Sequence, residues 1–177
     1  MSSQPTGSDP TPRRHRGWKR FVGFSALGLL VLFGLAQLVP FGHSYVPFGH
    51  PTGNPPVTKA AVWTNPQAQT IAEHACYDCH SNLTKWWLGT NVAPMSWLAQ
   101  NDVNGGRAIL DFSEWDKPQA ALDEVTEVVQ EGGMPPLQYK LAHPNARLSD
   151  AERQTLVEGL RQLYATDPPA GVKQGGG

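Results

Sequence analysis

Nineteen uncharged residues, 21–39, form the longest apolar stretch of the chain. As a helix they would span about 28 Å, close to the roughly 30 Å hydrocarbon core of a bilayer. Lysines and arginines flank only their N-terminal side, and Trp18 stands at that border. This asymmetry predicts an uncleaved transmembrane anchor with the N-terminus in the cytoplasm. The alternative is a cleaved signal peptide, whose apolar region would usually be about 7 to 15 residues long.

Beyond residue 63 the apolar residues recur with helical spacing. Asn65 followed by Pro66 predicts a capped helix that runs to the first cysteine. Further helices are predicted over 96–107, ending at a Gly-Gly pair, and over 116–130, ending at a second such pair. A capping box beginning at Ser149 predicts the last helix. No segment alternates with a period of two, so we expect an all-α domain with long loops after one transmembrane helix.

Composition predicts how the chain is divided into segments. We expect a disordered basic tail at 1–20, the transmembrane anchor at 21–39, a Pro/Gly-rich tether at 40–63, one folded domain at 64–166 and a disordered tail at 167–177. From residue 21 onward there are nine Lys/Arg and fourteen Asp/Glu, which gives a net charge of −5. A chain without a basic face is not expected to bind nucleic acid.

The two cysteines of the chain both lie in Cys76-Tyr77-Asp78-Cys79-His80. This is the pattern of c-type haem attachment. Two thiols separated by two residues at a helix end can reach the two vinyl groups of one haem, and the next side chain then lies beneath the iron. The motif predicts one covalent haem c, held by Cys76 and Cys79, with His80 as an iron ligand.

Three other uses of two cysteines fit the motif less well. A thioredoxin-like dithiol follows a strand and does not need the adjacent histidine. A structural zinc needs further ligands, usually a second Cys or His pair. A disulfide across so short a loop would add little stability.

The sixth iron ligand has several candidates. Met134 follows Gly132-Gly133 and precedes Pro135-Pro136, so it stands in a stiff loop between two helices, suited to place a thioether over the opposite haem face. The alternative interpretation of Met134 is a core methionine that fills a packing gap. His143 is the alternative ligand, whereas Met95 is expected to pack on the proximal side.

Several further motifs accompany the attachment sequence. They are Cys-Tyr-Asp-Cys-His-Ser-Asn at 76–82, Asn-Val-Ala-Pro at 91–94, Ser-Trp-Leu at 96–98, Phe-Ser-Glu-Trp at 112–115, Met-Pro-Pro at 134–136, His-Pro at 143–144 and Ala-Arg-Leu-Ser at 146–149. In combination they resemble the bacterial haem-binding domain family of monohaem c-type proteins, over about residues 21–164. The resemblance implies a cytochrome c-like helical domain with electron-transfer activity.

Similarity to small c-type cytochromes also implies roles around the haem. The Pro94 carbonyl is expected to accept a hydrogen bond from the His80 ring, which would orient the ligand. Trp97 is expected to wall the haem, together with Trp86, Trp87, Trp115 and Tyr139. An indole N–H or Arg107 is expected to meet a haem propionate.

These residues predict a membrane-anchored electron carrier outside the cytoplasmic membrane, on the periplasmic or extracellular side. His80 and Met134 would be its axial ligands, and its partner would be a redox protein, such as a respiratory or photosynthetic complex. One alternative is a haem sensor or small-ligand enzyme with an open sixth position. Another is a fixed cytochrome subunit of such a complex.

Overall fold

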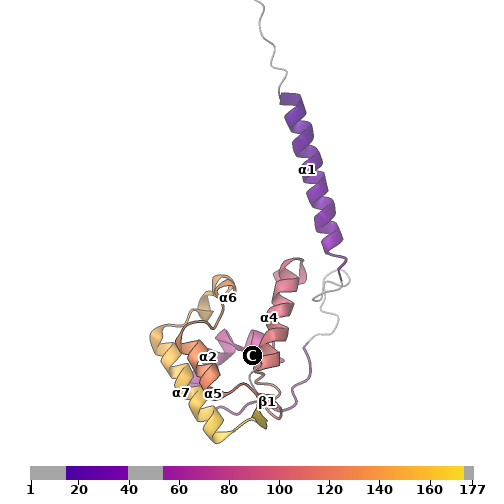
Figure 1. The fold of residues 1–177 in the computed structure, drawn as a ribbon. Helices are drawn as coiled ribbons and strands as arrows, with labels where there is room; N and C mark the ends of the chain where they lie inside the picture. The colour runs from indigo at the N-terminus through magenta and orange to yellow at the C-terminus, as the bar shows by residue number, and fades with distance from the viewer. Residues whose placement is uncertain (1–14, 40–53, 174–177) are drawn as a thin grey trace, which may run out of the picture. The chain divides into compact units, whose positions relative to one another are not determined.

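The computed structural model describes residues 15–39 and 54–173, which belong to two separate units, an N-terminal helix and a folded domain. The helices are α1 (His15–Ala36), α2 (Pro66–Ala75), α3 (Tyr77–His80), α4 (Met95–Ile109), α5 (Leu122–Gln130), α6 (Leu137–Ala142) and α7 (Asp150–Thr166) (Figure 1). Two 3-10 turns cover Leu88–Asn91 and Pro144–Ala146. Strands β1 (Pro118–Gln119) and β2 (Gly171–Val172) form one short parallel pair. The expected all-α class with one N-terminal apolar helix is confirmed.

Helix α1 is long and apolar enough to cross a membrane over Gly17–Ala36. Its large apolar side chains, such as Phe24 and Leu29, are exposed within their own unit. The helix begins before the predicted stretch of 21–39 and ends at Ala36, three residues earlier than expected.

Side-chain caps start two helices of the domain as the sequence predicts. The Asn65 side chain accepts hydrogen bonds from the backbone N–H groups of Gln67 and Ala68, both at 3.1 Å, at the start of α2. Ser149 and Glu152 form both hydrogen bonds of a capping box at the start of α7. These local signals therefore set the positions of two helices that pack against each other.

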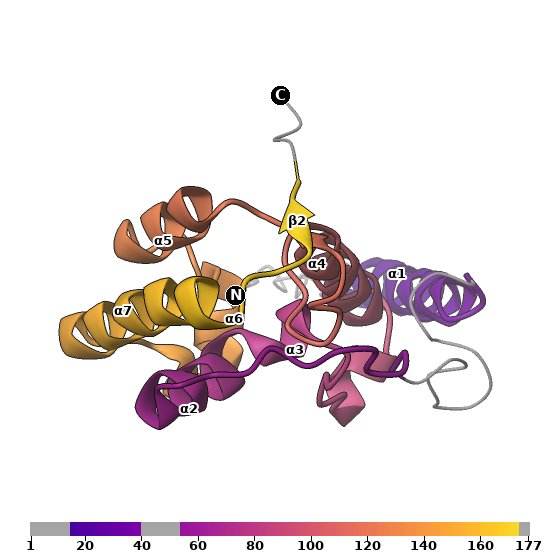
Figure 2. The same ribbon diagram turned by 90° about the horizontal axis from the view of Figure 1, so that it is seen from below.

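The domain consists of two groups of helices joined by the cysteine motif. Helix α7 packs against α2 and α5, while α3 packs against α4. Figures 1 and 2 both show α2, α5 and α7 on one side of the domain and α4 on the other. Because α3 follows α2 almost directly, the cysteine motif lies where the two groups meet.

Helices α2 and α7 approach closely at Gly159. A Cβ atom added to Gly159 would lie 2.1 Å from the Cβ of Ala68, which is fully buried. Leu156, Leu160 and Leu163 of α7 are buried around this contact. The absence of a side chain at 159 therefore allows the two helices to bury their apolar faces against each other.

Part of the predicted tether belongs to the folded domain, which corrects the boundary at residue 64. The backbone N–H of Ala61 donates to the Phe112 carbonyl at 2.8 Å, and Trp115 N–H donates to the Lys59 carbonyl at 2.9 Å. Trp63 is buried in the core, 9% exposed. Composition could not show these contacts, because they join segments about fifty residues apart. The tether prediction for 40–53 lies outside the described residues.

The predicted tail at 167–177 also begins too early. Asp167 accepts hydrogen bonds from Lys59 Nζ and from the Val62 N–H, both at 3.0 Å. The Trp115 indole N–H donates to the Asp167 carbonyl at 2.6 Å, and β2 then pairs with β1. Residues 167–173 are therefore ordered by their partners, although they are rich in Pro and Gly.

The third predicted helix starts later than expected. Pro118, taken as the first turn of a helix over 116–130, is in β1, and α5 begins at Leu122. Its predicted end is right, because α5 stops at Gln130 and Gly132 then adopts a positive φ of 75°.

We predict that Gly159→Ala destabilises the domain although alanine favours helix. The helix propensity gain of about 1 kcal/mol opposes an overpacking cost of about 1–3 kcal/mol, since the added Cβ would overlap with Ala68. Urea unfolding monitored by circular dichroism should show a lower midpoint. The exposed neighbour Glu158→Ala should change the free energy of unfolding by less than about 0.5 kcal/mol. Equal stability of the Gly159→Ala variant and the wild type would contradict the close approach.

Candidate functional site

The cysteine motif forms a single helical turn, in which Cys76 joins α2 to α3 and the other four residues are α3. Cys76 N–H donates to the Ala72 carbonyl at 2.8 Å and so closes α2. The Cys76 carbonyl then accepts from the N–H groups of Cys79 at 3.1 Å and His80 at 2.8 Å. Both cysteines are free thiols and half-buried. The turn therefore holds the two thiols and the imidazole in one rigid unit.

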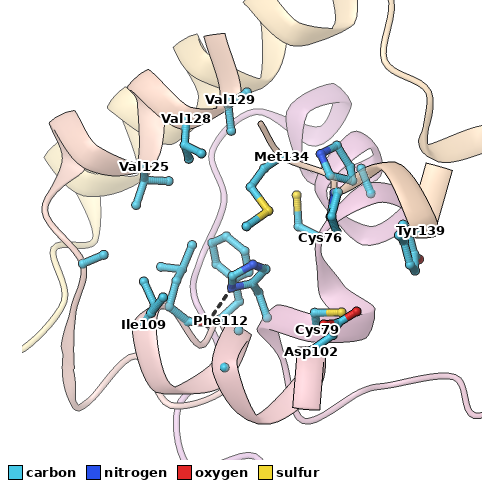
Figure 3. A pocket seen from close by; sticks show the side chains of 18 of the residues that line it. Cys76, Cys79, Asp102, Ile109, Phe112, Val125, Val128, Val129, Met134 and Tyr139 are labelled. Atoms are coloured by element: carbon cyan, nitrogen blue, oxygen red, sulfur yellow. Dashed lines mark hydrogen bonds between the residues drawn. The ribbon is translucent and has the colours of Figure 1, made fainter. Parts of the chain in front are cut away.

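These three side chains open into a cavity of about 460 Å³, which we call the main cavity. Its apolar wall is formed by Ile109, Leu110, Phe112, Val125, Val128, Val129, Leu156 and Leu160. Figure 3 shows Cys76 and Met134 pointing into this space, with Val125, Val128 and Val129 of α5 across from Cys79. The volume lies within the range of about 300–1,000 Å³ found for small-molecule and cofactor sites.

His80 is oriented by a backbone carbonyl at the end of α4. Its Nδ1 lies 3.0 Å from the Leu110 carbonyl, in the position of an N–H donor. This arrangement leaves Nε2 as the nitrogen available to a metal. Burial lowers the pKa of His80, although the backbone of Leu110 and of Gly106 acts in the opposite direction, and so favours the neutral imidazole, the form that can ligate a metal.

The expected acceptor for His80, the Pro94 carbonyl, is therefore wrong. That carbonyl instead accepts the N–H groups of Trp97 at 3.1 Å and Leu98 at 3.3 Å in the first turn of α4. Pro94 is used as the cap of this helix, so its carbonyl points along α4. Leu110, sixteen residues later and just past the other end of α4, takes the orienting role.

Burial also changes the pKa values of the two thiols. It raises the pKa of both Cys76 and Cys79 to about 12, with a smaller contribution from the other nearby negative groups. Burial therefore favours the neutral thiol form of both side chains. Within 15–39 and 54–173 no group of three His, Cys, Asp or Glu side chains could hold a metal ion.

Helix α4 lies directly against the cysteine turn at Gly106. A Cβ at this position would lie 2.5 Å from the Cys79 carbonyl oxygen. The sequence predicted that Gly105-Gly106 ends the helix, but α4 continues to Ile109. The expectation is wrong because Gly106 serves a close approach between two elements and does not terminate the helix.

Met134 follows the left-handed turn at Gly132. Its N–H donates to the Val128 carbonyl at 3.2 Å, which fixes the loop to the end of α5. The side chain lines the main cavity with His80 and is 36% exposed. A neutral imidazole and a thioether reaching one apolar cavity are a donor set that fits haem iron.

The haem-binding domain family model matches residues 31–162. The chain belongs to this family. No curated protein and no solved structure matches the chain in the corresponding searches. Haem is therefore the group that the main cavity has to fit, and its apolar walls and iron-ligand set do fit it.

His143 and two of the tryptophans line a second cavity in this haem-binding domain. This cavity, about 210 Å³ in volume, is lined by His143, Trp86, Trp87 and Met95 among others, and shares Cys79, Asp102, Gln138 and Tyr139 with the main cavity. Met134 and His143, the two candidates for the sixth ligand, thus lie in different cavities. Only Met134 shares the main cavity with His80.

Other residues expected at the haem lie elsewhere. Trp97 lines neither cavity, and its Nε1 is buried without a hydrogen-bond partner in the described part of the chain. Trp115 is fully buried in the core, stacked on Phe112 with ring centroids 5.8 Å apart. Phe112 and Tyr139 are the aromatic residues that line the main cavity.

Arg107, expected near a haem propionate, supports the loop that follows the motif. It donates to the Ser81 carbonyl at 2.9 Å, to Thr84 Oγ1 at 2.9 Å and to Asn54 Oδ1 at 3.1 Å. Its Nε and Nη2 donors therefore bond to the protein itself.

Sequence reasoning missed several residues of the main cavity. Leu110 has no polar side chain, and its role depends on a backbone carbonyl. Val125, Val128 and Val129 lie on the helix predicted over 116–130, but the sequence assigns them no role at the site. The available signal was the position of this apolar face just before Met134.

We predict that Gly106→Ala lowers both stability and haem content. The new Cβ would overlap with the Cys79 carbonyl and push α4 away from the cysteine turn, at a cost of about 1–3 kcal/mol. Urea unfolding and the haem-to-polypeptide absorbance ratio measure the two effects. Asn104→Ala, an exposed change on the same helix, should leave both nearly unchanged. Normal haem content and stability in Gly106→Ala would exclude this contact as a support of the site.

Proposed function

We propose that this chain is a membrane-anchored monohaem c-type cytochrome that carries electrons. The observation that carries the proposal is that Cys76, Cys79, His80 and Met134 all line one cavity. In this proposal the two cysteines bind the porphyrin covalently, and His80 and Met134 bind its iron. When bound, haem supplies a one-electron ferric/ferrous couple.

Met134 favours electron transfer over a haem sensor or a small-ligand enzyme. With a histidine and a methionine on the iron, no position stays open for a small ligand, which argues against a sensor or an enzyme. The thioether also raises the reduction potential. A fixed subunit of a respiratory or photosynthetic complex would use the same ligands, and would differ by co-purifying with that complex in mild detergent.

The anchor and its orientation follow from the apolar helix. Gly17–Ala36 is long enough to span a bilayer, and Arg13, Arg14, Arg16, Lys19 and Arg20 stand at its N-terminal end. The positive-inside rule then puts the N-terminus in the cytoplasm and the haem domain on the periplasmic or extracellular side. A redox protein on that side would be its partner.

Covalent attachment is tested by haem staining of denatured protein. Expressed in a host competent for cytochrome c maturation, the wild type should keep haem-dependent peroxidase staining on a denaturing gel. The double variant Cys76→Ala, Cys79→Ala should lose it, since no sulfur atom is left to bind the porphyrin. An unstained wild type, or a stained double variant, would refute c-type attachment.

Axial ligation is tested by Met134→Ala. We expect the variant to lose the sulfur-to-iron band at the red end of the ferric spectrum and to bind CO rapidly when reduced. Its reduction potential should fall by on the order of 0.1 V, since axial ligands set haem potentials over about 0.8 V. Met95→Ala is the matched control, because Met95 lines only the second cavity. A wild-type spectrum in Met134→Ala would assign the sixth position to another ligand.

A further inference from the structure

The second cavity is lined by aromatic and charged side chains that haem binding in the main cavity does not explain. It lies between the start of α4, the segment 84–90 and the end of α6. It contains neither His80 nor Met134, so the iron site belongs to the main cavity. The two cavities share Cys79, Asp102, Gln138 and Tyr139, and Figure 3 shows Cys79, Asp102 and Tyr139 on one side of the main cavity.

We propose that the second cavity binds a small neutral aromatic molecule that carries a hydroxyl group, a phenol or hydroquinone, beside the Cys79 edge of the haem. This proposal rests on the proposed function, because it takes the main cavity as the haem site.

Size limits the ligand to about one ring. A dry cavity of about 150 Å³ accepts benzene. The second cavity, at about 210 Å³, has room for one ring with one or two substituents. Trp87, Met95 and Leu98, which line the cavity, are half-exposed, so the cavity is open to solvent on that side.

The walls favour an aromatic ring. Trp86 and Trp87 line one side, and Tyr139 and His143 line another as a stacked pair with ring centroids 4.1 Å apart. The Met95 thioether adds a polarisable contact, of the kind that sulfur makes with aromatic rings. Offset and edge contacts with such rings stabilise an aromatic guest beyond simple burial.

Charge disfavours an anion. Two carboxylates, Asp78 and Asp102, and one ammonium group, that of Lys85, line the cavity, which gives a net charge of −1. The Asp78 carboxylate accepts from Tyr139 OH at 2.8 Å and from Lys85 N–H at 3.0 Å, which fixes it in the wall. An aromatic carboxylate would be repelled by these charges, whereas a neutral phenol would not.

Two of the polar side chains that line the cavity can accept a hydrogen bond from a ligand. The Nδ1 of His143 faces the Tyr139 carbonyl at 3.3 Å, which leaves Nε2 to accept from a ligand O–H. The Asp102 carboxylate has one long contact, 3.5 Å from the Gln138 amide, and can accept a further donor. A hydroxyl group satisfies these acceptors, and an unsubstituted ring does not.

A titration with 4-methylphenol, followed by the NMR signals of the haem methyl groups, tests the proposal on the full haem-loaded chain in mild detergent. We expect a saturable shift of the methyl signals nearest Cys79, with a dissociation constant on the order of 0.1–1 mM for so small a ligand. Benzoate should bind at least about tenfold more weakly. If the absorption spectrum of the purified protein shows no haem bands, the proposed function is refuted before any titration begins.

Ala142→Trp fills the second cavity from α6, and Leu98→Trp fills it from α4. Each should abolish saturable binding while the haem spectrum stays that of the wild type. Leu141→Trp is the matched control, because Leu141 is 66% exposed and lines neither cavity, so binding should persist. If one filling variant does not fold, the other decides.

Three outcomes would overturn the proposal. The first is no saturable shift in the wild type. The second is equal binding to wild type and both filling variants, which indicates partition into detergent. The third is binding of 4-methylphenol to haem-free protein alone, which would make the second cavity part of the haem seat.

Discussion

The position of His80 depends on two hydrogen bonds to the segment that follows α4. Its ring Nδ1 bonds to the Leu110 carbonyl at 3.0 Å, and its own carbonyl accepts the Phe112 N–H at 2.9 Å. The ring and the backbone of His80 are thus held by Leu110 and Phe112, which are two positions apart. Because Gly106 also brings α4 against Cys79, the cysteine turn and the end of α4 form one rigid part of the site.

The other part of the site comes from the helices packed on α7. Helix α5 contributes three valines to the main cavity and the carbonyl that fixes the Met134 loop. Each group of helices therefore supplies one candidate iron ligand, and apolar walls face each other across the space between them. A large apolar cofactor in this space would join the two groups, which helps a domain of this size to complete its core.

Signals confined to a few neighbouring residues could be predicted from the sequence. The cap at Asn65, the capping box at Ser149 and the cysteine motif depend on contacts within one turn, and each predicts its element. Contacts between distant segments could not be predicted. The role assigned to Pro94 belongs to Leu110, because any residue offers a carbonyl and only the fold decides which one faces the ring. Gly106 was misinterpreted for the same reason, since a glycine at a helix crossing looks like a glycine at a helix end.

Residues 59–61, near the start of the domain, pair with the residues that follow Leu110. Ala61 bonds to the Phe112 carbonyl, and Lys59 bonds to Ser113 and Trp115. The Phe112 carbonyl, which Ala61 holds, lies two residues from the carbonyl that orients His80, and Trp115 lies five residues from it. A change in the pairing of residues 59–61 would therefore displace the carbonyl that orients the His80 ring, although none of these residues touches the ring itself.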